Sequence, residues 1–416
     1  MLEVETFTQF TQFSCAGGSL LNSYRKYAAN YKAGHACLTL PPDKGLGGDL
    51  RYSSRRRRHG RNSSCGSPLA VPRTLLDEQK ESIRSISAYR DVEQESGVRF
   101  FHEVGLLTVS SCAEETERGL RSAGGERFEA QELKRRWPFM TFSGEVYAHL
   151  QATGAGWIDP REHVRAHLNL SRSRGVDIVE GAATKLEREG ELWSVEVDHA
   201  EYVVTKKVVF ALGAFTNLSG LIPKESSPEY DMWGKAVFHA RIAEDEATAL
   251  LSAGMPVVMW KFSPSDNTSA NSLVSYEGHK KGSYVYFFPP IRYSDGNWYI
   301  KIGHSPFDPL IGQLNGETET DKLRKWMQTE GDDVVDLQKQ SESFFKSTLQ
   351  TLFPDTTFLE GGYLSPCVTS RSRTGEVILD ALPSELKGLY ACSGCNGAGA
   401  QFAHEWGRQL SNIAQQ

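Results

Sequence analysis

The residues best suited to hold an anionic ligand lie in a glycine-rich segment near the carboxyl end of the chain. Gly394, Gly397 and Gly399 come just before residues 402–413, whose amphipathic pattern predicts a helix. Backbone N–H groups at a helix N-terminus have no internal acceptor, and the helix dipole is positive there. The segment therefore predicts a turn that can bind an anionic group. A merely tight turn is the alternative.

A thiol and an ammonium group could also take part in chemistry. Cys367 follows Pro366 in an expected strand, where a free cysteine commonly packs as a small hydrophobic residue. Lys301 lies in an alternating strand pattern at residues 298–302, where a lysine commonly faces solvent. Residue type alone leaves both the structural and the chemical roles open.

Other candidate sites are weaker. Cys392 and Cys395 form a C-x-x-C pair, but no second ligand pair lies nearby, so we expect neither a metal site nor a redox motif. The seven cysteines are scattered and do not form a disulfide framework. The arginine run at residues 55–58 lies in Ser/Gly-rich sequence. We interpret it as a disordered, solvated loop, with a nucleic-acid patch as the alternative.

The elements that must position these residues alternate between helix and strand. We expect helices at residues 75–95, 163–174 and 318–352, and strands at residues 104–109, 176–179, 193–197 and 207–213. Such alternation predicts parallel pairing through crossovers. The strands expected between residues 235 and 305 are closely spaced, with an Asp295-Gly296 turn, which predicts an antiparallel sheet.

Four motifs, in order, resemble the family of FAD-dependent amine oxidases that includes monomeric sarcosine oxidase, N-methyltryptophan oxidase and pipecolate oxidase. They occupy residues 155–160 (AGWIDP), 208–217 (VVFALGAFTN), 288–304 and 366–400. The resemblance extends over roughly residues 96–412. Each motif is weak alone, and their order and spacing carry the resemblance.

The resemblance implies an FAD cofactor in close contact with backbone. The expected cofactor-binding residues are Gly213, Ala214, Gly394, Asn396, Gly397, Gly399 and Cys367. In the family, the cysteine at the position of Cys367 carries a thioether to the 8-methyl group of the flavin. The lysine at the position of Lys301 lies beside flavin N5, where a fixed positive charge assists the reduction of oxygen. Tyr286 and His304 match positions that line the substrate pocket.

The chain departs from the family at the substrate end. Gln401 stands where the family has a lysine that binds a substrate carboxylate, and glutamine supplies no charge. Arg371 and Arg373 follow Cys367 and could restore the charge, or could simply be solvated. A simple amino-acid substrate is therefore not assured by the resemblance.

The amino-terminal segment also departs. The family opens with a G-x-G-x-x-G turn inside a βαβ unit, followed by an acidic residue for the ribose. Here Gly17-Gly18 is followed by Asn22 in place of the third glycine. Pro41-Pro42 occupies the place of the acid, after an expected strand at residues 34–40. A mistranslated or alternatively spliced segment is the explanation we favour, and true divergence is the other.

The fold expected is α/β with two domains (α+β in arrangement): a discontinuous Rossmann-like FAD-binding domain and an antiparallel substrate domain. Residues 1–75 form an atypical start of the FAD-binding domain, residues 76–154 and 218–340 the substrate domain, and residues 155–217 and 341–416 the rest of the FAD-binding domain. The net charge of −6 argues against nucleic acid or an anionic membrane as partners. The absence of a secretory signal predicts a cytoplasmic protein, which we expect to be a monomer.

The predicted function is oxidation of a secondary or N-methyl amine, such as sarcosine or pipecolate, to an imine, with O2 reduced to H2O2. A cofactor-poor relative that acts as a binding protein is the alternative. A nucleic-acid-associated factor acting through residues 55–58 is a more remote one.

Overall fold

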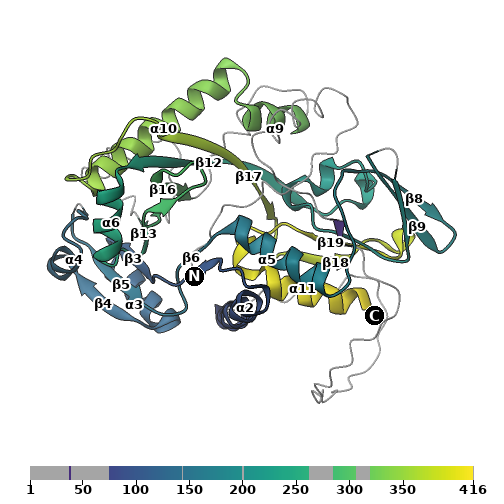
Figure 1. Ribbon diagram of the computed structural model, residues 1–416, viewed down its shortest axis with the longest axis horizontal. Coiled ribbons are helices and arrows are strands. Elements are labelled where there is room, and N and C mark those ends of the chain that lie inside the picture. The colour runs from purple at the N-terminus through teal and green to yellow at the C-terminus, as the bar shows by residue number, and fades with distance from the viewer. Residues whose placement is uncertain are drawn as a thin grey trace, which may run out of the picture.

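The computed structural model describes residues 37–38, 75–142, 144–198, 201–261, 284–305 and 319–415 (Figure 1). The glycine, arginine-rich and proline motifs of residues 1–74 lie outside the described residues. Of the strand expected at residues 34–40, the structure describes Cys37 and Leu38, which form β1. The described chain is a mixture of helices and sheets, as expected. No helix within these residues is long and apolar enough to cross a membrane.

The largest element is a nine-stranded sheet, which is antiparallel except where β13 runs parallel to β3. Its continuous order is β17-β12-β16-β14-β13-β3-β5-β4, with β15 paired to β16. The strands are β17 (Tyr363–Ser372), β12 (Tyr230–Ile242), β16 (Trp298–Ser305), β14 (Tyr284–Phe287), β13 (Val257–Lys261), β3 (Leu106–Ser110), β5 (Tyr147–Gln151), β4 (Glu126–Glu129) and β15 (Ile291–Arg292). Strand β17 lies in the residues predicted to belong to the FAD-binding domain, and it forms an edge of this sheet.

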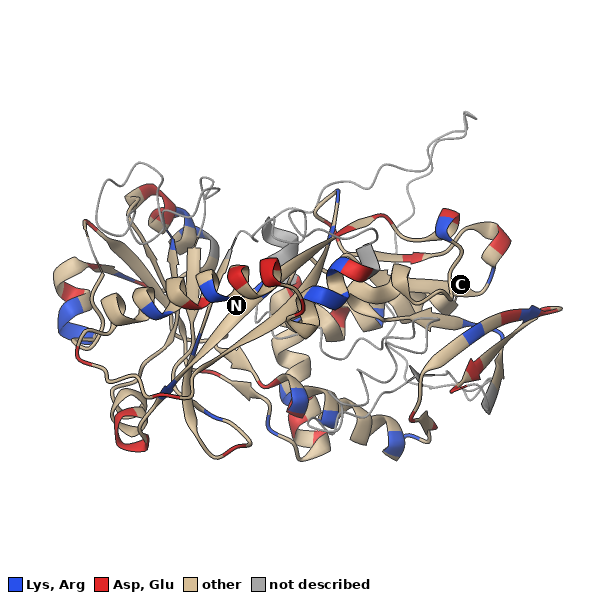
Figure 2. Cartoon of the chain, turned by 90° about the horizontal axis from the view of Figure 1, so that it is seen from above, with Lys and Arg blue, Asp and Glu red and all other residues tan. Residues whose placement is uncertain are grey.

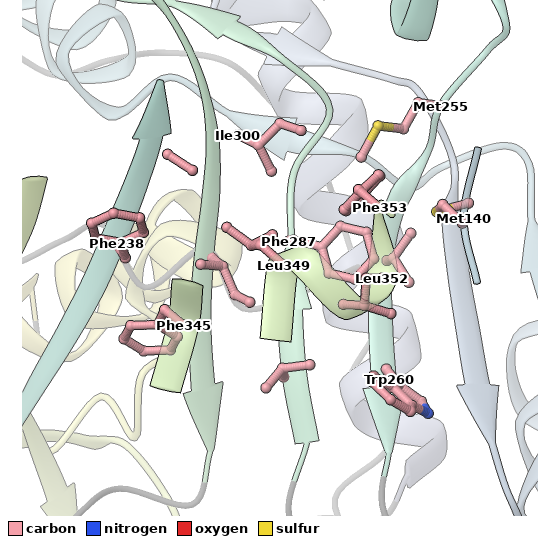
Figure 3. Packing of buried hydrophobic residues seen from close by; sticks show 14 of the residues in the cluster. Met140, Phe238, Met255, Trp260, Phe287, Ile300, Phe345, Leu349, Leu352 and Phe353 are labelled. Atoms are coloured by element: carbon pink, nitrogen blue, oxygen red, sulfur yellow. The ribbon is translucent and has the colours of Figure 1, made fainter. Parts of the chain in front are cut away.

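Helices cover one face of the sheet and bury its main hydrophobic core. Helix α10 (Asp332–Leu352) packs Phe345 and Leu349 against alternate apolar residues of the central strands, including Phe287 and Ile300 (Figure 3). Period-two alternation on each strand and 3.6-residue periodicity on the helix bring these side chains together. The remaining helices of this region are α3 (Ala113–Ala123), α4 (Ala130–Arg136), α6 (Glu244–Ser252) and α9 (Glu319–Gln328).

The prediction of a single helix at residues 318–352 is wrong in one respect, because this segment is divided into α9 and α10. Thr329 has φ of 57° and Gly331 has φ of 93°. An α-helix requires negative φ, so the helix ends at Gln328 and restarts at Asp332.

Smaller sheets form the other part of the molecule. Strand β11 (Val208–Phe210) runs parallel to β19 (Leu389–Ser393), which pairs antiparallel with β18 (Ile378–Ala381). Parallel pairing of segments so distant in sequence agrees with the expected Rossmann-like pattern. An antiparallel sheet contains β8 (Ala183–Glu189), β9 (Leu192–Val197) and β10 (Glu201–Thr205), and 3-10 helices cover Gly213–Leu218 (η1), Lys224–Ser226 (η2) and Ser384–Leu386 (η3).

Among the described residues, the strands on either side of the helix predicted at residues 163–174 do not pair in parallel. Helix α5 (Pro160–Ser173) connects β6 (Trp157–Ile158) to β7 (Ile178–Val179), but these short strands belong to different sheets. Strand β6 pairs antiparallel with β2 (Phe101–His102), and β7 pairs antiparallel with β1 (Cys37–Leu38).

Three helices pack together beside the small sheets: α2 (Leu75–Ser96), α5 and α11 (Gly399–Gln415) (Figure 1). Asp159 caps α5 by accepting from the backbone N–H groups of Arg161 and Glu162. Tyr89 on α2 donates its hydroxyl to the carbonyl oxygen of Gln401, 2.8 Å away, and so fixes the start of α11. Acidic and basic residues are interspersed over the helices and outer strands in the view of Figure 2.

Candidate active site

The nine-stranded sheet has a second face, opposite helix α10, on which several polar residues lie close together. The register places Lys235 of β12 beside Cys367 of β17, and His239 of β12 beside Lys301 of β16. Residues separated by an even number along a strand share a face, so these four share one face. We call it the site face.

Lys301 is deeply buried on this face. The residue is 2% exposed, and its Nζ atom lies 5.5 Å from the centroid of the Phe288 ring, over the π face. Burial lowers the pKa of Lys301 from 10.5 to about 7, while the nearby Cys367 acts in the opposite direction. Lys301 therefore changes its charge close to neutral pH.

Cys367 is buried in the same region, directly opposite Lys235 and two strands from Lys301. Burial raises the pKa of its thiol above the usual value, and the positive charges of Lys235 and Lys301 oppose this increase. Trp326 of α9 donates its indole N–H to the Cys367 carbonyl oxygen at 3.0 Å, which holds the strand in place. The structure thus brings the predicted thiol and ammonium groups onto one face.

Two residues of this face were not anticipated from the sequence. Lys235 is 3% exposed. His239 is 4% exposed and stacks on Tyr363, with ring centroids 4.5 Å apart. Burial, followed by the charge of Lys301, lowers the pKa of His239 to about 3, so its ring is neutral at physiological pH. If one site residue on β12 had been known, strand alternation would have identified the other. No sequence motif marks that strand.

Tyr286 joins Lys301, whereas His304 does not. Tyr286 pairs with Gly303 on the site face, and its ring meets the edge of Phe288 at 5.8 Å between centroids. His304 is three residues from Lys301, so it points to the other face, where its ring lies 5.5 Å from that of Phe345 on α10. The expectation that His304 lines the same pocket is therefore not supported by its position.

The glycine-rich turn has the backbone conformation that its sequence suggests. Gly394, Asn396 and Gly397 all have positive φ, of 63°, 53° and 84°. Gly399 is the first residue of α11, as expected for a turn that leads into a helix N-terminus. Backbone N–H groups at a helix N-terminus can donate to an anionic partner.

Asn396 ties this turn to the end of β17. Its backbone N–H donates to the carbonyl oxygen of Ser370 at 2.9 Å, and its Oδ1 accepts from the N–H of Ser372 at 3.1 Å. Ser370 is three residues beyond Cys367, or about 10 Å along an extended strand. One strand therefore supports both the thiol and the turn.

The second expected glycine motif is also at a bend. Gly213 has φ of 57° and begins the 3-10 helix η1, which follows β11 after two residues. Ala214 is fully buried, and its carbonyl oxygen accepts a hydrogen bond from the Tyr230 hydroxyl at 3.1 Å. The Tyr230 contact links this bend to the start of β12.

The predicted substrate residues occupy different surroundings. Gln401 is 9% exposed, and its side-chain Nε2 donates to Ser82 of α2 at 2.9 Å, which is a helix-to-helix contact. Arg371 pairs with Asp231 in the β12–β17 register and has the same parity as Cys367, so it shares the site face. Arg373 makes an exposed ion pair with Glu229 at 3.4 Å. Of these, Arg371 is the residue that shares a strand and a face with Cys367.

The described residues fit the expected FAD cofactor on two observations. A turn with three positive-φ residues, Gly394, Asn396 and Gly397, presents backbone at a helix N-terminus, which suits an electron-rich ring edge. A buried cation, Lys301, and a buried thiol, Cys367, lie on the site face, and the strand that carries the thiol is hydrogen-bonded to the turn through Asn396. The ribose and diphosphate partners expected in residues 1–74 lie outside the described residues.

Comparisons with known proteins agree with this geometry. The sequence pattern of the FAD dependent oxidoreductase family (DAO) matches residues 50–413. A search of curated proteins finds no match.

Solved structures with a similar fold include NikD, described as an unusual amino acid oxidase essential for nikkomycin biosynthesis. It is 17% identical, with 82% of this chain and 81% of that chain covered at a TM-score of 0.55. L-proline dehydrogenase from P. horikoshii is 15% identical, covering 84% and 82% at 0.56. Iminodiacetate oxidase from Chelativorans sp. BNC1 is 13% identical, covering 84% and 82% at 0.56.

At these identities the structural likeness shows the fold alone, and the family pattern shows the membership. That pattern covers most of the chain, including the turn, Lys301 and Cys367. The chain belongs to the DAO family of FAD dependent oxidoreductases.

Proposed function

We propose that this protein oxidises a secondary or N-methyl amine to an imine and reduces O2 to H2O2. FAD would supply the chemistry, by accepting a hydride from the carbon next to the amine nitrogen and passing two electrons to O2. The observation that carries the proposal is the pair of buried residues, Lys301 and Cys367, on one sheet face beside the glycine-rich turn.

Lys301 would act as a fixed positive charge. It is held in a dry site over Phe288, where a charge interacts more strongly with developing negative charge than it would in water. As O2 takes up electrons it gains negative charge, and protonated Lys301 stabilises that charge. With a pKa of about 7 in the free chain, this residue can also release and regain a proton during turnover.

Tyr286 and Arg371 would bind and orient the amine. Tyr286 places a hydroxyl on the same face as Lys301, among apolar residues such as Phe288 that exclude water. Arg371 supplies a positive charge on the Cys367 strand, which suits a carboxylate-bearing amine. The hydrogen bond from Gln401 to Ser82 favours Arg371 over Gln401 for that role.

The class of amine is supported by the fold relatives only as an analogy. Proline and iminodiacetate, named for two of the similar structures, are both secondary amines with carboxylates. Sarcosine and pipecolate belong to the same chemical class. We also propose that the protein is a cytoplasmic monomer. Sedimentation of the purified chain measures its oligomeric state directly.

Cys367 would hold the flavin through a thioether to its 8-methyl group. The test is acid precipitation of the purified protein, which retains yellow colour in the pellet only when the flavin is covalently bound. We expect Cys367→Ser to lose this colour and Cys392→Ser, at a cysteine that is partly exposed, to keep it. Peroxide release is then measured with a panel of secondary, N-methyl and primary amines.

A cofactor-poor binding protein remains the second candidate. The family pattern begins at residue 50, so the segment expected to carry the G-x-G-x-x-G turn lies outside the match. A native protein that is colourless, and that stays colourless after incubation with FAD, would support this candidate and contradict the oxidase.

A further inference from the structure

Lys235 and Cys367 are direct neighbours across two strands. They form one cross-strand pair in the antiparallel β12–β17 ladder. Side chains at such opposed positions project to the same face, with Cβ atoms about 4.5–5.5 Å apart. The Lys235 ammonium group and the Cys367 sulfur are therefore within reach of each other without any movement of the backbone.

Both members of the pair are removed from water. Lys235 is 3% exposed and Cys367 is 9% exposed. At low dielectric, the interaction between an ammonium group and a thiolate is much stronger than at a surface. A buried positive charge is also costly unless an anionic group can balance it. A buried Lys235 ammonium group therefore favours the ionised form of the side chain directly opposite, which is that of Cys367.

The other titratable groups near the thiol act less directly. Lys301 lies two strands away, opposite His239, which is four residues further along β12 than Lys235. Lys235 has the larger effect of the two lysines on the pKa of Cys367. His239 is neutral at physiological pH and Tyr363, stacked on it, is a phenol, so neither adds charge.

We propose that Lys235 is a positioning residue that promotes the ionisation of Cys367: its ammonium group, directly opposite the sulfur, stabilises the thiolate and opposes the burial that favours the thiol. The thiolate is the nucleophilic form of cysteine. On ionisation the thiol S–H bond breaks and its proton passes to solvent or to a neutral lysine, while the electron pair stays on sulfur.

The use of that thiolate rests on the proposed function. When the sulfur bonds to the 8-methyl carbon of FAD, one C–H bond of that methyl group breaks and its proton leaves. Two electrons remain on the ring, and O2 removes them as H2O2. Lys235 would therefore govern how fast the covalent link forms, and Lys301 would govern turnover.

The ionisation is measured in the full-length, flavin-free chain as a function of pH. The readout is the ultraviolet absorbance of thiolate in each protein minus that of its Cys367→Ser counterpart, so that the other cysteines cancel. We expect Lys235→Met to raise the midpoint by at least about one pH unit, which is about a tenfold smaller thiolate fraction below the midpoint. Lys235→Arg should keep the midpoint close to that of the unmodified chain.

Lys301→Met is the matched control, since it removes a second buried lysine from the same face. Its midpoint should rise by less than that of Lys235→Met. If Lys235→Met does not fold, as judged by circular dichroism, Lys235→Gln is measured in its place. An unchanged midpoint in whichever folded variant is measured, or a larger shift in Lys301→Met, overturns the proposal.

A second readout follows acid-stable flavin over time after FAD is added. Lys235→Met should form it about tenfold more slowly, and Lys235→Arg should restore the rate. If the unmodified chain forms no acid-stable flavin, the covalent link in the proposed function fails. The midpoint shift still decides the role of Lys235 in that case, so the two failures are distinguishable.

Discussion

Replacing Lys301 by methionine should stabilise the flavin-free protein and remove the activity of the flavin-bound protein. Methionine has a similar length and no charge, so it fills the same space beside Phe288. Burial lowers the pKa of Lys301 from 10.5 to about 7. At about 1.4 kcal/mol per pKa unit, this corresponds to an upper limit of roughly 5 kcal/mol of unfavourable free energy. Relaxation around the charge reduces the expected gain to about 2–4 kcal/mol.

The pH dependence gives this prediction its distinctive form. Below about pH 7 the lysine is protonated in both the folded and the unfolded chain, so the full cost of burying the charge is present. Between pH 7 and 10.5 the folded chain releases its proton first, and the cost declines as pH rises. The difference in unfolding free energy between variant and parent should therefore be largest at or below pH 7 and vanish near pH 10.5.

The assay is urea unfolding of both proteins at several pH values, with the slope of the transition checked for constancy. Lys339→Met is the control, because that lysine is 70% exposed on α10 and its replacement should give a small difference that is independent of pH. A Lys301→Met variant whose stability difference does not change between pH 7 and 10 would refute the buried-cation assignment.

Two further changes test the surroundings of the site. Glu405→Gln should lower the unfolding free energy by about 1–2 kcal/mol, because Arg408 hydrogen-bonds this carboxylate and holds its pKa at about 2. That contribution is fully present above about pH 4.5 and is lost as pH falls towards 2, so urea unfolding should show a smaller difference between variant and parent at pH 3 than at pH 7. Gly303→Ala should cost about 1–3 kcal/mol by thermal or urea unfolding, since its Cβ would lie 2.4 Å from the Tyr286 hydroxyl oxygen. Gly407→Ala on α11, where a Cβ meets nothing within 4 Å, should instead be neutral or stabilising.

The sequence predicts the chemistry of Lys301 and Cys367 better than it predicts which residues lie next to them. Both residues sit in recognisable motifs, and the turn at residues 394–399 is marked by its glycines. Lys235 carries no such mark, because its role follows from pairing with a residue 132 positions later, at Cys367. A register between strands so distant in sequence depends on the whole sheet, and local patterns do not specify it.

The position of His304 could have been found from the sequence. Once Lys301 is placed on the site face, strand alternation puts every residue at an odd separation on the other face, where His304 meets Phe345. The break between α9 and α10 was also signalled, by Gly331. The parallel pairing of β13 with β3 was not, because the chain gives no local sign of which distant strand will be a neighbour.

The pairing of β11 with β19 bears on how the protein is made. Strand β11 ends at Phe210, and its parallel partner begins at Leu389. During synthesis, all of the residues between these two positions must be made before the partner of β11 emerges from the ribosome. Such long-range contacts make folding slow, and the unpaired edge of β11 is exposed meanwhile. A chain that stops short of residue 389 would leave β11 without this partner, so premature termination should yield an aggregation-prone product and not a smaller enzyme.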